Sequence, residues 1–136
     1  MELILLSNGK ASGDAELLGY AKKQILTVLE RRKATKAILI PYALIRSNYD
    51  DRARDLEKTL GIQVTSIHHF DNQAEAIDQA ECIIISGGNT WMLNQMLHEK
   101  CLIVPIQRAV REREVPYIGW SAGCNVACPS IRTTND

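Results

Sequence analysis

The chain has 136 residues, of which 46% are apolar and 24% charged, with 16 Lys and Arg against 16 Asp and Glu. This composition predicts one globular domain over residues 1–136, without the basic excess that sequence-independent nucleic-acid binding requires. The longest apolar runs fall far short of the roughly 20 residues of a membrane-spanning helix, and the N-terminus lacks the features of a secretory signal. We therefore expect a cytoplasmic protein with no nucleic-acid and no membrane partner.

Short apolar runs rich in β-branched residues alternate along the chain with longer segments of helical periodicity. Glu2–Leu6 is predicted as a strand, apolar almost throughout, as a strand buried on both faces would be. Asp14–Arg32 follows as an amphipathic helix, because apolar residues recur every three or four positions and the last turn is basic. Lys36–Ile40 is the second strand, closed by Pro41.

The middle of the chain repeats this alternation. Asp50–Leu60 is predicted as a helix that ends at Gly61, the usual residue just past a helix end. Gln63–Ile67 alternates more between polar and apolar residues, which indicates a strand nearer an edge of the sheet. Asn72–Ala80 is a short helix with an Asp or Asn as its N-cap.

The last third carries the strand Cys82–Ser86, the helices Thr90–His98 and Leu102–Arg113, and the strand Tyr117–Trp120. A short helix is predicted to open directly after this strand. Alternating strands and helices are typical of a doubly wound α/β domain, with a mostly parallel sheet and helices on both faces.

The strongest motif is Gly119-Trp120-Ser121-Ala122-Gly123, which fits the G-x-S-x-G nucleophile elbow at a strand-to-helix turn. In such a turn a strained backbone exposes the serine hydroxyl, and the glycines allow strand and helix to approach closely. The Ala122 amide would then stabilise negative charge on a bound carbonyl oxygen. The alternative is a plain turn in which Ser121 only caps the helix.

A second turn, Ser86-Gly87-Gly88-Asn89-Thr90, also follows a predicted strand. In an open α/β sheet, ligands bind beyond the carboxyl ends of the strands, so we expect both turns to face one crevice. The amide of Gly88 or Asn89 would complete an oxyanion hole. The alternative is a tight turn with Asn89 or Thr90 as a helix cap.

Three segments of the sequence, MELILLSN, IIISGGNTWML and YIGWSAGCNVACPSIRTTND, closely resemble the peptidase E family, α-aspartyl dipeptidases of the serine peptidase group that includes cyanophycinase. The resemblance covers essentially the whole chain. It implies a glutamine-amidotransferase-like fold and hydrolysis of dipeptides with an N-terminal aspartate (Asp-Xaa), without metal or cofactor. By the same resemblance Ser121 matches the nucleophile, and the amides of Gly88 and Ala122 match the oxyanion-hole donors. Asn89 and the segment from Arg132 onward match the lining of the substrate crevice.

The sequence departs from the family pattern at two points. Ser86 stands where a glycine is usual. More severely, the family's catalytic histidine follows the nucleophile much later in the chain, whereas His68, His69 and His98 all precede Ser121. A serine needs a base to take its proton, so we expect the chain to match the N-terminal part of a longer peptidase that supplies the base. The missing segment would also pair with a sheet edge that is otherwise exposed. We therefore expect as partner either a second chain that carries the missing C-terminal half or further copies of this chain in a homo-oligomer.

Two other readings stay open. One is a cyanophycinase-like peptidase that acts on β-Asp-Arg. The other is a catalytically incomplete fragment that binds only a small ligand or a partner chain. For an acidic dipeptide substrate, Arg132 is the candidate carboxylate partner, because a guanidinium binds carboxylates in a bidentate fork; a surface ion pair is its alternative role.

The four cysteines follow no zinc-binding or CxxC spacing, so we expect free thiols and no metal site: Cys82, Cys101, Cys124 and Cys128. Cys124 lies beyond the elbow position and is predicted to be a small buried residue of the following helix.

Overall fold

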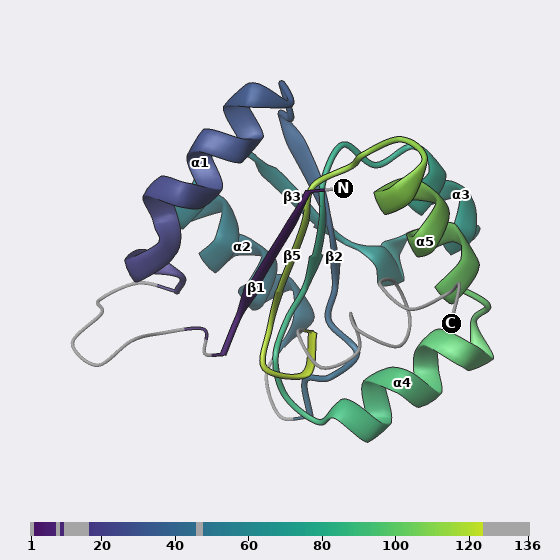
Figure 1. Cartoon of the computed structure of the whole chain (residues 1–136). Coiled ribbons are helices and arrows are strands. Elements are labelled where there is room, and N and C mark those ends of the chain that lie inside the picture. Colours follow the sequence, from purple (N-terminus) through teal and green to yellow (C-terminus); the bar gives the residue numbers. More distant parts are fainter. Residues whose placement is uncertain (1, 8, 10–16, 46–47, 124–136) are drawn as a thin grey trace.

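A parallel five-stranded sheet forms the centre of the protein, in the strand order β1-β5-β4-β2-β3 (Figure 1). The computed structural model describes residues 2–7, 9, 17–45 and 48–123. The strands are β1 (Leu3–Leu6), β2 (Lys36–Ile40), β3 (Gln63–Ser66), β4 (Ile83–Ile85) and β5 (Tyr117–Trp120). The helices are α1 (Lys22–Arg31), α2 (Tyr49–Leu60), α3 (Gln73–Asp78), α4 (Thr90–Glu99) and α5 (Ile103–Arg111). The predicted α/β class with a parallel sheet is confirmed.

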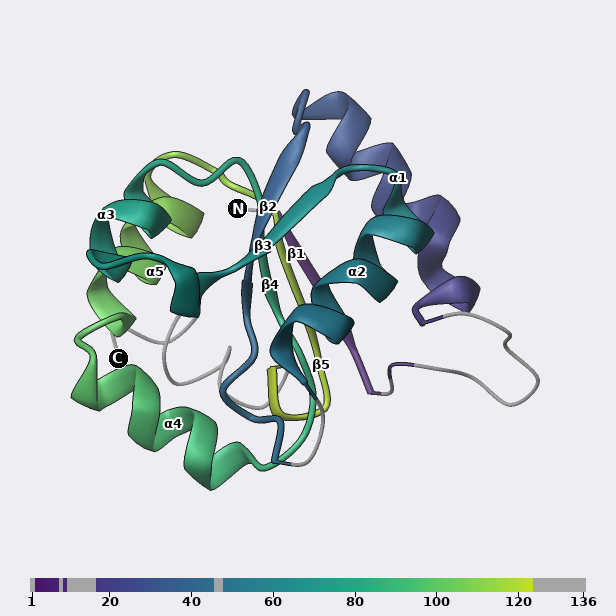
Figure 2. The same cartoon turned by 180° about the vertical axis from the view of Figure 1, so that it is seen from behind.

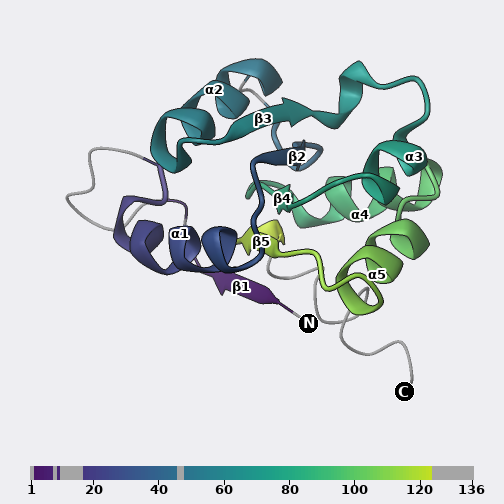
Figure 3. The same cartoon turned by 90° about the horizontal axis from the view of Figure 1, so that it is seen from above.

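Helices cover both faces of the sheet, as predicted. Figure 3 shows α1 and α2 on one side of the strands and α3, α4 and α5 on the other. Because successive side chains of a strand point to opposite faces, Ile38 and Ile40 belong to the core under α3, α4 and α5, whereas Leu39 belongs to the core under α1 and α2. The sheet thus separates two hydrophobic cores, and all its strands end at the same edge.

The two outermost strands are β1 and β3, and Figure 2 shows β3 beside α2. The prediction that Gln63–Ile67 lies at an edge is confirmed for the observed strand Gln63–Ser66. The prediction that the first strand is buried on both faces is wrong, because all four residues of β1 are only half-buried. The reason is its position, since β5 is the single neighbour of β1 among the strands that the structure describes.

The first predicted helix is regular only over its second half. Leu18 has a left-handed backbone with φ of 60°, and its N–H donates to the carbonyl of Gly9 at 2.6 Å. A 3-10 turn at Gly19–Ala21 then leads into α1. The predicted residues 14–16 lie outside the described residues. Burial of Leu18 in the core under α1 and α2 therefore overrides the helical periodicity at this point.

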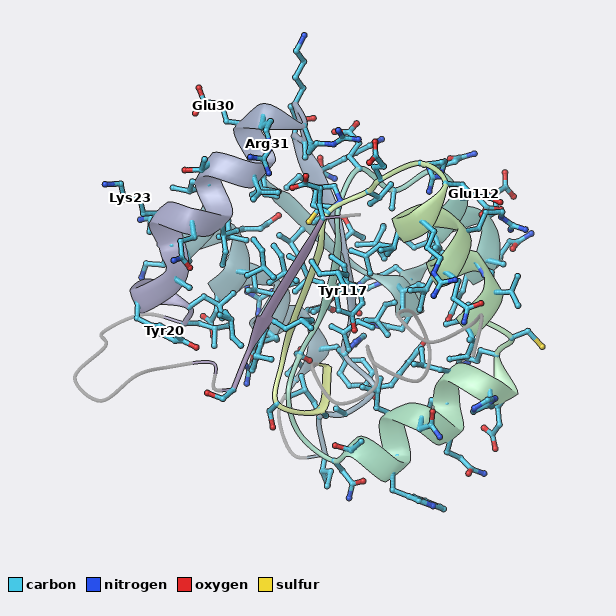
Figure 4. The ribbon with its side chains drawn as sticks, in the orientation of Figure 1. Tyr20, Lys23, Glu30, Arg31, Glu112 and Tyr117 are labelled. Atoms are coloured by element: carbon cyan, nitrogen blue, oxygen red, sulfur yellow. The ribbon has the colours of Figure 1, made fainter. Side chains whose placement is uncertain are left out.

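Side chains separate clearly into interior and surface (Figure 4). Tyr117 lies inside at the sheet, whereas Lys23 and Glu30 point outward from α1. Arg31 at the end of α1 pairs with the carboxylate of Glu2 at 2.5 Å, which ties this helix to the start of β1. In the part of the chain that the structure describes, no helix has the length and apolar character to cross a membrane.

Candidate active site

Ser121 follows β5 directly and has a strained backbone. Its φ of 53° lies in the left-handed region, which costs a non-glycine residue on the order of 1–2 kcal/mol. The Ser121 N–H donates to the carbonyl of Leu6 at 3.0 Å, so β1 holds the turn in place. The serine itself is exposed at the surface. The turn thus presents a hydroxyl to solvent at the carboxyl end of a central strand.

The glycines on either side of Ser121 allow the chain to turn back on itself closely. A Cβ on Gly119 would lie 2.8 Å from the carbonyl of Gly123, and a Cβ on Gly123 would lie 2.3 Å from the Ile85 oxygen. The buried Tyr117 hydroxyl donates to the Gly123 carbonyl at 2.7 Å and clamps the turn. Ala122 and Gly123 begin a helical turn, whose continuation lies outside the described residues.

The second glycine turn connects β4 to α4. Gly88 has φ of 143°, and a Cβ there would lie 2.1 Å from the carbonyl oxygen of Ala43, so only glycine fits. The Asn89 N–H donates to that Ala43 oxygen at 2.8 Å. The Asn89 side chain accepts from Met92 N–H at 2.8 Å and caps α4. Among the described residues the Gly88 amide has no hydrogen-bond partner, which leaves it, rather than the Asn89 amide, available to a ligand.

The two turns meet in space, because β4 and β5 are neighbours in the sheet. A Cβ on Gly87 would lie 3.0 Å from Ser121 Cβ and 2.9 Å from Trp120 Cδ1. The two turns border one open groove of about 380 Å³, which is lined by Gly9, Leu17, Arg52, Gly87, Gly88, Trp120 and Ser121. The structure thus brings Ser121 and Gly88 to one groove, with the buried Ala122 next in the chain.

Arg52 is a site residue that the sequence did not reveal. It lies in α2, is half-buried and lines the groove together with Ser121. Burial lowers the pKa of its guanidinium, and the Asp55 carboxylate partly offsets this effect. The Arg52 backbone N–H donates to the Asn48 carbonyl at 3.2 Å, but its guanidinium makes no ion pair or hydrogen bond with another described residue. Its acidic sequence neighbours Asp50, Asp51 and Asp55 are typical of a solvated helix face, and only the packing of α2 beside the groove distinguishes Arg52 from an ordinary surface residue.

The histidines lie away from Ser121. His68 and His69 follow β3, which is three strand positions from β5, or roughly 14 Å at about 4.8 Å per strand. His98 is in the last turn of α4, and about 14 Å of helix separate it from Asn89, which follows the groove residue Gly88. No histidine is among the residues that line the groove. A general base for Ser121 is therefore absent from the described residues.

The other residues singled out in the sequence are one arginine, four cysteines and Ser86. Arg132, Cys124 and Cys128 lie outside the described residues. Cys82 and Cys101 are free, and burial raises the pKa of the Cys82 thiol to about 12, which keeps it unreactive. Ser86 is fully buried, and its hydroxyl has no partner among the described residues, an unusual state for a polar side chain.

Comparisons with known proteins identify the family of the chain. The model of peptidase family S51 matches residues 3–136. The chain belongs to peptidase family S51. Peptidase E of Escherichia coli O6:K15:H31 (strain 536) is 42% identical over 139 residues, and Peptidase E of Salmonella arizonae is 43% identical over 139 residues. Each match covers 100% of this chain but 59% of the relative, so the S51 chain spans only part of the length of these relatives, as predicted.

Solved structures agree with the S51 fold. A 1.5 Å crystal structure of a Listeria monocytogenes EGD-e protein superimposes with a TM-score of 0.67 at 18% identity, covering 98% of this chain and 70% of that one. A peptidase from an acI-B1 Actinobacterium gives a TM-score of 0.56 at 18% identity, covering 92% of this chain and 55% of that one. At such low identity these matches establish the fold alone.

Proposed function

We propose that this chain is the nucleophile-bearing part of a serine peptidase that hydrolyses Asp-Xaa dipeptides. The observation that carries the proposal is Ser121 itself, exposed on a left-handed turn at the end of a central strand and beside a groove. Family S51 membership supports peptidase chemistry, and similarity to Peptidase E of Escherichia coli supports the peptidase E type. A cytoplasmic location remains part of the proposal.

The proposed reaction begins with attack of Ser121 Oγ on the peptide carbonyl. The Ser121 proton passes to a general base and then to the leaving amine, and water hydrolyses the acyl-enzyme. Amides of Gly88 and Ala122 would donate to the carbonyl oxygen as it becomes negative. We propose that the base comes from the part of the relatives that this chain does not span.

Arg52 supports an acidic substrate. A half-buried guanidinium in the groove, with no carboxylate paired to it among the described residues, suits a bidentate contact with the aspartate side chain. The sequence predicts Arg132 as the partner of the substrate carboxylate and Asn89 as a residue that lines the substrate crevice, but Arg132 lies outside the described residues. The Asn89 side-chain oxygen already caps α4, so we propose Arg52 rather than Asn89 as the residue that contacts the substrate carboxylate.

The test uses this chain and an extended chain, in which the C-terminal segment of the E. coli relative follows residue 136. Hydrolysis of an aspartyl anilide is measured against a leucyl anilide, with Ser121→Ala as the matched control. We expect the extended chain to cleave only the aspartyl compound and to lose this activity with Ser121→Ala. A folded extended chain without activity, or activity that survives Ser121→Ala, would overturn the proposal.

Two further substrates separate the alternatives. Preference of the extended chain for β-Asp-Arg over Asp-Leu would indicate a cyanophycinase-like peptidase. Binding of Asp-Leu without turnover by either chain would instead indicate a module that binds a ligand and does not catalyse.

A further inference from the structure

Two imidazoles and one carboxylate meet at the β3 edge of the sheet, and none of them is among the residues that line the groove. Asp50 is in the first turn of α2, and His68 and His69 are in the 3-10 turn that follows β3. One ligand atom from each of the three side chains lies within 4.8 Å of the other two. We propose that Asp50, His68 and His69 bind a zinc ion. This inference is independent of the reaction proposed for Ser121.

The Asp50 carboxylate already faces both rings. His69 Nε2 lies 2.7 Å from Asp50 Oδ1, and His68 Nε2 lies 4.0 Å from Asp50 Oδ2. Ligand atoms around a tetrahedral zinc ion are roughly 3.3 Å apart, given bonds of about 2.0–2.1 Å. The His69–Asp50 distance must therefore increase, and the His68–Asp50 distance must decrease, each by less than 1 Å. Small side-chain rotations achieve such changes.

Ser66 orients one of the two rings. Its oxygen lies 2.5 Å from His68 Nδ1, and Ser66 itself is fully buried at the end of β3. A His68 that donates its Nδ1–H to this oxygen keeps its Nε2 lone pair on the Asp50 side. Tyr49 packs edge-on against the same ring, with centroids 5.2 Å apart. A hydrogen bond from the second ring nitrogen is typical of histidines that bind metals.

Neither the N-cap of α2 nor Arg54 binds the carboxylate oxygens of Asp50, which therefore remain available to the two histidines and an ion. Asn48 caps α2 by accepting from the backbone N–H of Asp50 at 2.8 Å and of Asp51 at 3.2 Å, which uses no side-chain oxygen of Asp50. Arg54 on the next turn pairs with Asp51 rather than with Asp50. The cluster therefore keeps one carboxylate that faces two imidazoles.

Two imidazoles and one carboxylate favour zinc over Ca²⁺ and Mg²⁺. Imidazole nitrogen suits zinc and other late first-row metals, whereas Ca²⁺ and Mg²⁺ prefer sites built of oxygen alone. The side chains of Asp50, His68 and His69 are 43%, 33% and 51% exposed, so an ion enters from solvent and water completes its coordination. Bound zinc would join the start of α2 to the end of the edge strand β3.

The test is calorimetric titration of the whole chain with ZnCl₂ at pH 7. Variants His69→Ala and Asp50→Asn each remove one ligand, and His98→Ala removes an exposed histidine elsewhere as the matched control. Ser66→Ala removes the hydroxyl that orients His68 and keeps all three proposed zinc ligands. Circular dichroism establishes that each variant is folded.

We expect one zinc ion per chain, at least tenfold weaker binding for His69→Ala and Asp50→Asn, and unchanged binding for His98→Ala. Ser66→Ala should weaken binding by about tenfold, as loss of an outer contact does at other sites. Absence of binding, or equal affinity in all variants, would overturn the inference. Substitution with Co²⁺ adds a check, because a thiolate charge-transfer band would show that cysteines hold the ion instead.

Discussion

Gly87 abuts Ser121 so closely that a methyl group at position 87 would lie 3.0 Å from Ser121 Cβ and 2.9 Å from Trp120 Cδ1. The two residues belong to different turns, one after β4 and one after β5. Their contact means that the position of the exposed serine depends on the absence of a side chain from the neighbouring turn.

Gly87→Ala should therefore impair the proposed reaction more than it impairs folding. Displacing Ser121 by a few tenths of an ångström should lower kcat/KM of the extended chain at least tenfold, because reaction rates depend steeply on placement of the attacking atom. The measurement is aspartyl anilide hydrolysis together with thermal unfolding.

Gly61→Ala is the matched control for that substitution. Gly61 has φ of 70° at the end of α2, and a Cβ there would meet no atom within 4 Å. We expect Gly61→Ala to cost about 1 kcal/mol of stability from backbone strain and to leave kcat/KM unchanged. Equal losses of activity in the two variants would argue against a positional role for Gly87.

Arg52→Gln should weaken binding of the aspartyl substrate. Loss of a bidentate contact to a carboxylate should raise KM by about tenfold or more and change kcat less. Arg54→Gln is the matched control, because Arg54 is exposed on the same helix and pairs with Asp51. Equal KM values for Arg52→Gln and Arg54→Gln would remove Arg52 from the substrate site. Arg52→Lys tests whether the fork geometry or the charge matters.

Ser86→Ala should stabilise the protein. The Ser86 hydroxyl is buried without a partner among the described residues, and such a group carries a desolvation cost of about 1–3 kcal/mol. We expect chemical denaturation to give a free energy of unfolding higher by about 1 kcal/mol for Ser86→Ala. Ser121→Ala, which removes an exposed hydroxyl, should show no such gain. A loss of stability in Ser86→Ala would mean that the hydroxyl is hydrogen-bonded after all.

Glu81 should make stability depend on pH in the acid range. Its carboxylate accepts from the Thr35 N–H at 2.8 Å and from the Thr35 hydroxyl at 3.1 Å. The backbone bond from Thr35 lowers the Glu81 pKa most, ahead of the hydroxyl bond and the charge of Lys36. Because the folded pKa lies below the unfolded one, the stabilisation is complete at neutral pH and is lost as pH falls through the folded pKa.

Glu81→Gln isolates this contribution. Thermal unfolding of the variant should show a lower Tm than the parent at pH 7, and the difference should shrink as the pH falls below about 4. Glu75→Gln is a control on the surface, since Glu75 is exposed on α3. A Tm difference that stays constant down to pH 3 would exclude ionisation of Glu81 as the cause.

The sequence predicted the elements well wherever local signals agree with burial. The predicted strands Lys36–Ile40 and Tyr117–Trp120 coincide with β2 and β5, because their apolar β-branched and aromatic runs end at a proline or a glycine turn. The helix predicted over Asp14–Arg32 is wrong at Leu18. This residue lies fully buried in the core and has a left-handed backbone instead of a helical one.

Local sequence by itself located the two turns, since Gly87-Gly88 and Ser121 come shortly after the apolar runs that form β4 and β5. Tertiary structure alone decided the strand order, and with it which residues meet. Arg52 reaches the Ser121 groove, and Asp50 reaches His68 and His69, only because α2 packs beside the sheet. Such contacts join residues far apart in the chain, so no periodicity or spacing records them.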